Sequence, residues 1–127
     1  MARILIAEDE ESLRTLVTRA LALDGHDVVT ASNGAEALAI LAREGAAIHL
    51  FLTDVRMPVM DGITLALAAA SEHPDLSILL MTGYADQRER AAGLDALVHD
   101  VITKPFSAGM ICSTVNEALV AAARHAR

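Results

Sequence analysis

The sequence predicts an α/β fold in which helices cover both faces of a doubly wound, five-stranded parallel sheet. Short apolar runs alternate along the chain with longer segments of helical period. Several of these runs are almost continuously apolar, which is typical of strands that are covered on both faces. The length of 127 residues suits one domain with its own core. Strands and helices that alternate in this way imply parallel pairing with right-handed crossovers.

Five apolar runs are expected to form the strands, and they are Arg3–Ala7, Asp27–Ala31, Ile48–Thr53, Leu76–Met81 and Val98–Thr103. The first, third and fourth runs are nearly free of polar residues, which predicts that they lie inside the sheet. The second and fifth runs are more polar, as edge strands often are. The carboxyl ends of the three inner strands should therefore meet near the middle of one sheet edge.

Helices are expected between these strands. After the first strand, apolar residues recur at the i, i+3, i+4, i+7 and i+8 positions of one helix face, and they are Leu13, Leu16, Val17, Ala20 and Leu21. Asn33 and Glu36 have the spacing of a capping box, which predicts the start of the second helix. The third helix, which contains Ile63 and Leu67, should end at His73-Pro74, because the residue before a proline disfavours the helical conformation.

Two further helices are expected in the second half of the chain. One covers roughly Gln87–Ala92, with Gly93 as its stop. Ser107 is placed to cap the last helix. The residues expected on the inner face of that helix are Ile111, Val115, Ala118 and Leu119.

Composition excludes several classes of function. The formal net charge is −7, so no basic surface is left over to neutralise the phosphates of a nucleic acid. No apolar run approaches the roughly 20 residues of a membrane span, and the first residues lack the pattern of a signal peptide. One cysteine, Cys112, excludes an internal disulfide. We expect a cytoplasmic protein with a single domain over residues 1–127 and no output domain.

Reactive side chains follow the predicted strands at the edge where a doubly wound sheet binds its ligands. Glu8 and Asp9 follow the first strand, Asp54 the third, Thr82 the fourth and Lys104 the fifth. Each of these residues alone has a plain alternative role as a helix cap or turn residue. Together they place several carboxylates beside one cation, and clustered carboxylates repel one another unless a proton or a cation intervenes.

The ligand types in this cluster indicate its chemistry. All the candidate ligand atoms are oxygens, so a hard cation such as Mg²⁺ is the natural partner. A metal ion, the ammonium of Lys104 and the hydroxyl of Thr82 around one carboxylate suit a phosphoryl group, whose charge is spread over several partners. Gly83 leaves room for a group to approach the backbone. Asp54 is then the candidate nucleophile that forms an acyl phosphate.

These motifs resemble the receiver domains of two-component response regulators (CheY-like). The resemblance covers essentially the whole chain and rests on the pair Glu8-Asp9, on LTDVRMPVMDG around Asp54, on MTG with Thr82 and on KPF with Lys104. It implies a (βα)5 receiver fold with the strand order 2-1-3-4-5. It also implies a signalling protein, not an enzyme, that catalyses only its own phosphorylation and dephosphorylation.

The resemblance implies roles for the acidic residues. Asp54 would accept a phosphoryl group from a histidine kinase or a histidine phosphotransfer protein. Asp9 and Asp54 would bind Mg²⁺ with the main-chain carbonyl of Arg56, and Glu8 would act through water.

The resemblance also implies how the site holds phosphate and where this chain departs from the family. Thr82 and Lys104 would hold the phosphoryl oxygens, and the Lys104–Pro105 peptide bond is expected to be cis. Many receivers carry Tyr or Phe three residues before this lysine, where this chain has Val101. A switch that rotates an aromatic ring is therefore not available at that position.

Within the receivers, the chain is similar to the stand-alone CpdR-type regulators of alphaproteobacteria, which also lack the switch aromatic. The similar segments are MARILIAEDE, LTDVRMPVMDG and LLMTGYADQRERAAGLDALVHDVITKPFS. This similarity implies a role in the cell cycle, in which the unphosphorylated form helps a ClpXP-type protease to reach its substrates and phosphorylation ends that help.

Three alternatives remain open at this point. A phosphate-independent, receiver-like interaction module would have the same fold. A flavodoxin-like FMN binder is disfavoured by the acidic residues after the first strand and by an aromatic content of only 2%. A Mg²⁺-dependent phosphatase typically has a second catalytic Asp two residues after the nucleophile, where this chain has Arg56.

Overall fold

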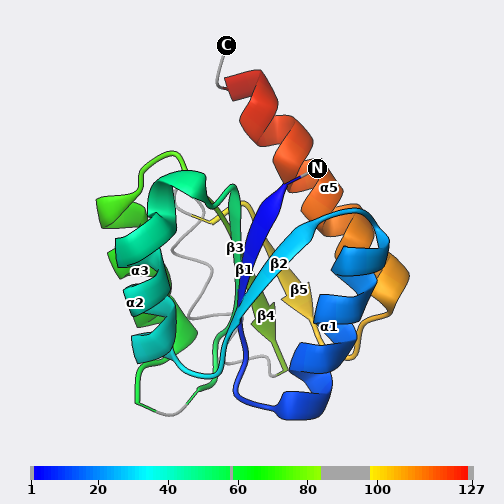
Figure 1. Ribbon diagram of the computed structural model, residues 1–127. Coiled ribbons are helices and arrows are strands. Elements are labelled where there is room, and N and C mark those ends of the chain that lie inside the picture. Colours follow the sequence, from blue (N-terminus) through cyan, green and yellow to red (C-terminus); the bar gives the residue numbers. More distant parts are fainter. Residues whose placement is uncertain (1, 58, 84–97, 126–127) are drawn as a thin grey trace.

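The computed structural model describes residues 2–57, 59–83 and 98–125, and its centre is a five-stranded parallel sheet (Figure 1). The strands are β1 (Arg3–Ala7), β2 (Asp27–Ala31), β3 (Leu50–Asp54), β4 (Ser77–Thr82) and β5 (Asp100–Thr103). Their order in the sheet is β2-β1-β3-β4-β5. The predicted α/β class and the strand order are therefore confirmed, as are the central place of β1, β3 and β4 and the edge place of β2 and β5.

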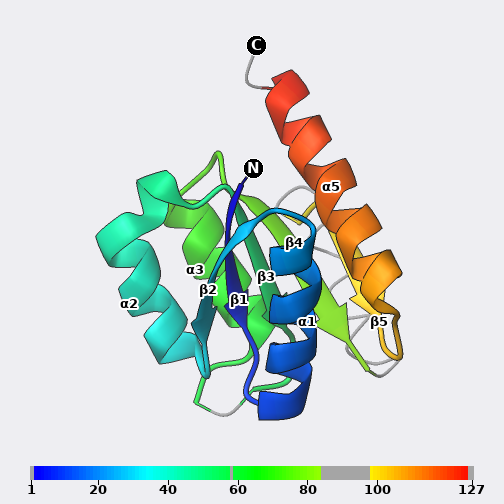
Figure 2. The ribbon, with the colours of Figure 1, turned by 45° about the vertical axis from the view of Figure 1, so that its right-hand side comes forward.

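Helices cover both faces of this sheet. They are α1 (Glu11–Leu23), α2 (Gly34–Glu44), α3 (Gly62–Glu72) and α5 (Ala108–His125), with a short 3₁₀ helix, η1 (Gly45–Ala47), after α2. Figures 1 and 2 show α1 and α5 on one face and α2 and α3 on the other. The helix expected around Gln87–Ala92, with its stop at Gly93, lies outside the described residues.

The predicted bounds of three strands were wrong by one or two residues. The third strand begins at Leu50 and not at Ile48, because Ile48 donates its N–H to Gly45 at 3.2 Å and so ends η1. The fourth is displaced by one residue, to Ser77–Thr82, and the fifth begins only at Asp100. As a result Asp54 and Thr82 are the last residues of their strands, where pairing with the neighbouring strand fixes their backbone.

Alternating side chains of the inner strands form two separate cores. Leu5, Phe51 and Leu80 point to the face that α2 and α3 cover. Ile6, Leu52 and Met81 point to the opposite face, under α1 and α5. All six side chains are completely buried. Burial of this apolar surface from both sides holds the sheet rigid, and a rigid sheet fixes the strand ends that carry the polar residues.

The helix α1 buries a narrower stripe than its sequence pattern predicts. Val17 and Leu21 are buried, but Leu16, which was expected on the same face, is 47% exposed. The stripe is centred on Val17 and Leu21 because these residues contact the core beneath α5. In α5 the predicted inner face is confirmed, and only Leu119 of its residues is partly exposed.

The predicted helix starts are confirmed with one difference in detail. The side chain of Asn33 accepts the Glu36 N–H at 2.8 Å, but the Glu36 carboxylate accepts from the Ser32 hydroxyl at 3.0 Å. Only half of a capping box is therefore formed. Ser107 caps α5 by accepting the N–H of Met110 at 3.1 Å. The cap of α3 was not predicted, and it is Asp61, which accepts the Thr64 N–H at 2.9 Å.

Candidate functional site

Three carboxylates meet at the carboxyl edge of the sheet. Glu8 and Asp9 follow β1, and Asp54 ends the neighbouring strand β3. One oxygen of each residue can be chosen so that the three oxygens lie within 4.8 Å of one another. The convergence that the sequence predicted is thus present in the structure.

The cluster faces a cavity of about 540 Å³. Its lining residues come from the segments after β1, β3, β4 and β5, and they are Glu8, Asp9, Glu10, Asp54, Arg56, Gly83, Lys104 and Pro105. The cavity lies where a doubly wound sheet is expected to bind its ligand. Gly83 lines it as predicted, and a Cβ built there would approach only Lys104 Cδ, at 3.8 Å, among the described residues.

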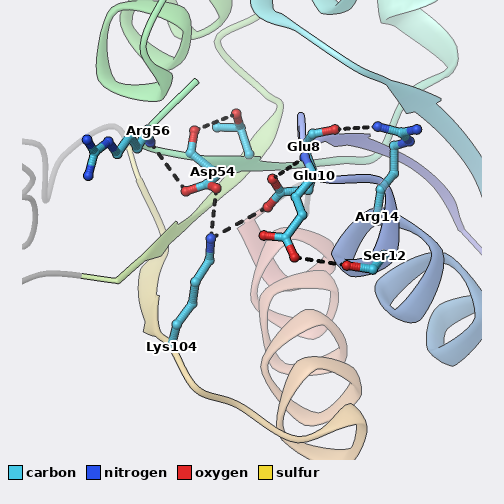
Figure 3. Close-up of polar contacts among 8 residues, drawn as sticks. Glu8, Glu10, Ser12, Arg14, Asp54, Arg56 and Lys104 are labelled. Atoms are coloured by element: carbon cyan, nitrogen blue, oxygen red, sulfur yellow. Dashed lines mark hydrogen bonds and ion pairs between the residues drawn. The ribbon is translucent and has the colours of Figure 1, made fainter. Parts of the chain in front are cut away.

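Lys104 joins the two buried carboxylates. Its Nζ donates to Asp54 Oδ2 at 2.8 Å and lies 3.6 Å from Glu8 Oε1 (Figure 3). Burial lowers the pKa of Lys104, but the hydrogen bond to Asp54 and the charges of Asp54 and Glu8 outweigh burial, so the pKa is raised above 10.5. The ammonium therefore stays charged at neutral pH and balances part of the acidic cluster.

Asp54 is only 4% exposed, and both of its oxygens have a partner. Oδ2 accepts from Lys104, and Oδ1 accepts the Arg56 N–H at 3.3 Å. Figure 3 shows the Arg56 guanidinium directed away from Asp54. Arg56 thus approaches the carboxylate through its backbone. The use of its carbonyl as a metal ligand remains a prediction.

Glu8 is the most buried carboxylate of the cluster, at 1% exposure. Burial raises the pKa of Glu8 from 4.5 to about 8; the neighbouring Asp54 acts in the same direction, against the hydrogen bond from the Glu10 N–H. That N–H lies 3.0 Å from Glu8 Oε2, while Oε1 has no hydrogen bond within the described part of the chain. A cation beside Glu8 would favour its charged form.

Thr82 is the one predicted site residue that does not line the cavity. It is the last residue of β4, is completely buried, and its Oγ1 has no hydrogen-bond partner among the described residues. A buried hydroxyl without a partner is costly. The Thr82 hydroxyl thus has a donor that no described residue uses, and Thr82 is followed by Gly83, which does line the cavity.

Two expectations concern β5 and the segment after it. The Lys104–Pro105 peptide bond is cis, as expected. Val101 is partly buried and packs against the core that α2 and α3 cover. The position that carries an aromatic ring in many receivers is thus occupied by a packed aliphatic side chain.

Sequence reasoning missed the residues that support the acidic pair. Arg14, from the first turns of α1, donates Nη1 to the Glu8 carbonyl at 2.9 Å. Glu10 lines the cavity and donates its N–H to the Glu8 side chain. The available signal was the presence of a basic residue near the start of α1, which is an unfavourable place for a cation.

The buried Glu8 predicts a pH dependence of stability in the absence of divalent cations. Between pH 4.5 and about 8 the folded state holds a proton that the unfolded state has lost. The folded state thus binds more protons, so the free energy of unfolding should fall as the pH rises through this window. Urea unfolding at several pH values measures this fall. Glu8→Gln should show a smaller fall, and an identical fall in the variant would contradict the assignment to Glu8.

Fold and site together define a doubly wound α/β protein with an acidic crevice at the point where the strand order reverses. The protein-family model of the response regulator receiver domain matches residues 4–116 of the chain. The chain therefore belongs to the response regulator receiver domain family of two-component signalling.

Relatives of known name agree with this assignment. The chain is 38% identical over 125 residues to the response regulator receiver protein CpdR of Brucella abortus. The match covers 96% of this chain and 100% of that protein. Other relatives are longer. The chain spans only 12% of the sensor kinase CckA of Brucella abortus, at 38% identity, and 42% of the probable transcriptional regulator ycf27 of Porphyridium aerugineum, at 36% identity.

Solved receiver structures have the same fold. A CheY-like receiver domain protein of Methanospirillum hungatei matches with a TM-score of 0.89 and 26% identity, over 98% of both chains. TrrA of Thermotoga maritima, a response regulator protein solved in complex with Mg²⁺-BeF, matches with a TM-score of 0.82 and 28% identity, over 93% of this chain and 99% of that one.

No helix in the described part of the chain combines the length and the apolarity that a membrane span requires.

Proposed function

We propose that Asp54 is the phosphoryl acceptor of this receiver and that its donor is a phosphohistidine on a kinase or a phosphotransfer protein. The observation that carries the proposal is the contact of Lys104 Nζ with Asp54 Oδ2, at 2.8 Å, beside two further carboxylates in one cavity. The cation and the acidic cluster are the groups that phosphoryl transfer to a carboxylate needs. The family match favours this function over an FMN binder and over a phosphatase.

The donor set fits Mg²⁺. Glu8, Asp9 and Asp54 offer only oxygen atoms, which hard cations prefer. The buried Oε1 of Glu8 has no hydrogen bond within the described residues, so it is available to a metal-bound water. We infer that Asp9, Asp54 and the Arg56 carbonyl hold the ion and that Glu8 acts through water. Mg²⁺ would neutralise charge on the transferring phosphoryl oxygens.

In the proposed reaction, a carboxylate oxygen of Asp54 attacks the phosphorus atom of the phosphohistidine. The P–N bond breaks as the new P–O bond forms, and the leaving imidazole takes up a proton from solvent. Lys104 would exchange its contact with Asp54 for one with a phosphoryl oxygen. The unpartnered hydroxyl of Thr82 would donate to another phosphoryl oxygen, which requires Thr82 to approach the cavity.

We further propose that the chain acts as a stand-alone receiver whose output is a change of protein partner. The match to CpdR of Brucella abortus over that protein's whole length supports this proposal. A ClpXP-type protease is the proposed partner of the unphosphorylated form, with phosphorylation ending the interaction. On this proposal the protein acts on no substrate other than the phosphoryl group that Asp54 receives. Its cytoplasmic location stays a prediction.

An amide NMR titration tests the proposed function. Spectra are recorded with Mg²⁺ before and after beryllofluoride is added, because this complex mimics an aspartyl phosphate. We expect shifts around Asp54, Thr82 and Lys104 that extend along β5 past Val101. Shifts confined to the residues around the cavity would contradict a conformational change that is transmitted from the cavity to a partner-binding surface. No shift at all would favour the phosphate-independent interaction module.

A further inference from the structure

Helix α1 carries a cation at the end where a cation is least favourable. Arg14 is the fourth residue of the helix, near the positive pole of the helix dipole. It is partly buried, so its position is not that of a freely solvated surface charge. An arginine in this place needs a compensating contact.

Arg14 makes that contact with the peptide group that joins Glu8 to Asp9. Arg14 Nη1 donates to the Glu8 carbonyl oxygen at 2.9 Å, and Figure 3 shows the side chain of Arg14 reaching from α1 to this atom. The Glu8 carbonyl belongs to the peptide unit that joins Glu8 to Asp9. The orientation of this unit decides where the two carboxylates point.

Within the described part of the chain, the other contacts of Glu8 do not involve this peptide unit. The Glu8 N–H donates to Ala31 at 3.1 Å, which extends the pairing of β1 with β2. The carboxylate accepts from the Glu10 N–H and lies near Lys104. These contacts hold the preceding peptide and the side chain, and among the described residues it is Arg14 that holds the Glu8 carbonyl.

We propose that Arg14 is a positioning residue of the cation site. By fixing the Glu8–Asp9 peptide, it aims both carboxylates at the cavity that also holds Asp54. This inference rests on the proposed function, because it presumes that the acidic cluster binds a divalent cation. Residues that orient metal ligands through a hydrogen bond change affinity by roughly 10- to 100-fold when they are replaced.

Charge and positioning predict opposite effects for the same substitution. A guanidinium near the acidic cluster repels a divalent cation, so loss of its charge alone would strengthen cation binding. Loss of the hydrogen bond frees the Glu8–Asp9 peptide and would weaken binding. The sign of the change in affinity therefore separates the two roles of Arg14.

The experiment measures Mn²⁺ affinity by electron paramagnetic resonance for the full chain, with Mg²⁺ as competitor. Arg14→Met removes the charge and the donors but keeps a similar apolar stem. We expect its affinity to fall by about 10-fold. Arg14→Lys keeps the charge and a single donor group, so it should recover part of the affinity. Arg19→Met, on an exposed position of the same helix, is the matched control and should bind like the wild type.

A second readout needs no metal. Amide NMR spectra without Mn²⁺ or Mg²⁺ should show the largest shifts of Arg14→Met at Glu8, Asp9 and Glu10. Urea unfolding confirms that each variant is folded at the temperature of the measurement. If Arg14→Met does not fold, the comparison of Arg14→Lys with the wild type decides, since a role of charge alone predicts no change there.

The outcomes distinguish this inference from the function on which it rests. Equal or tighter Mn²⁺ binding by Arg14→Met overturns the positioning role while the proposed function stands. A wild-type protein that does not bind Mn²⁺ or Mg²⁺ overturns both. Weaker binding with partial recovery in Arg14→Lys supports the inference.

Discussion

Asp54→Asn is expected to abolish phosphorylation completely. An amide oxygen is too weak a nucleophile to form the acyl phosphate, and the substitution also removes one charge from the cation site. Glu8, the other buried carboxylate of the cluster, is less well placed to replace Asp54, because it lies 3.6 Å from Lys104 Nζ, whereas Asp54 lies at 2.8 Å. Intact-mass spectrometry after incubation with acetyl phosphate and Mg²⁺ measures the phosphorylated fraction.

The matched control for this prediction is Asp75→Asn. Asp75 is exposed, lies before β4 and lines a different cavity from that of Asp54, so its loss should leave phosphorylation unchanged. Spectra with beryllofluoride should shift in Asp75→Asn and not in Asp54→Asn. A phosphorylated species that persists in Asp54→Asn would contradict the assignment, unless peptide mapping places it on another residue.

The sheet could be predicted from the sequence because burial on two faces produces a simple pattern. A central strand such as β3 must be apolar on both faces, and Leu50, Phe51 and Leu52 satisfy that requirement. The site could be predicted for a related reason. The topology brings the carboxyl ends of parallel strands to one edge, so Asp54 and Glu8 become neighbours although many residues separate them along the chain. The strand order itself came from the family resemblance.

Other features depend on contacts that no local pattern contains. The hydrogen bond from Arg14 to the Glu8 carbonyl requires the exact angle at which α1 leaves β1. The buried and unpartnered hydroxyl of Thr82 follows from where β4 ends, which the sequence placed one residue too early. Val59 has a φ of 72°, a conformation that valine disfavours, so the preference of the residue itself argues against it. Long-range packing decides the first two, whereas the Val59 side chain is 86% exposed.

The glycine whose replacement should be most damaging to the fold lies where the loop after Asp54 meets α3. Gly62, the first residue of α3, donates its N–H to the Val55 carbonyl at 2.7 Å. A Cβ at this position would lie 2.0 Å from the Asp54 carbonyl oxygen and 2.8 Å from Val55 Cα. Both atoms belong to the backbone of a central strand and its continuation, so they cannot turn aside as a side chain would.

We therefore expect Gly62→Ala to lower the free energy of unfolding by about 3 kcal/mol, which is at the upper end for overpacking. Because the displaced atoms belong to the backbone of Asp54 and of the residue after it, the Asp54 carboxylate should move. Cation binding should therefore weaken in the fraction that remains folded. Urea unfolding gives the first quantity and Mn²⁺ titration the second.

Gly109→Ala separates this steric effect from the general effect of removing a glycine. Gly109 lies in α5, and a Cβ there would meet only Ser107 Oγ, at 3.9 Å, among the described residues. Alanine favours a helix over glycine, so this control should be as stable as the wild type or slightly more stable. If Gly62→Ala behaved like Gly109→Ala, the close packing of α3 against the Asp54 peptide would not be a requirement of the fold. A large loss confined to Gly62→Ala would mean that the start of α3 holds the acceptor strand in place, and that the MDG segment is needed to position the carboxylate as well as to turn the chain.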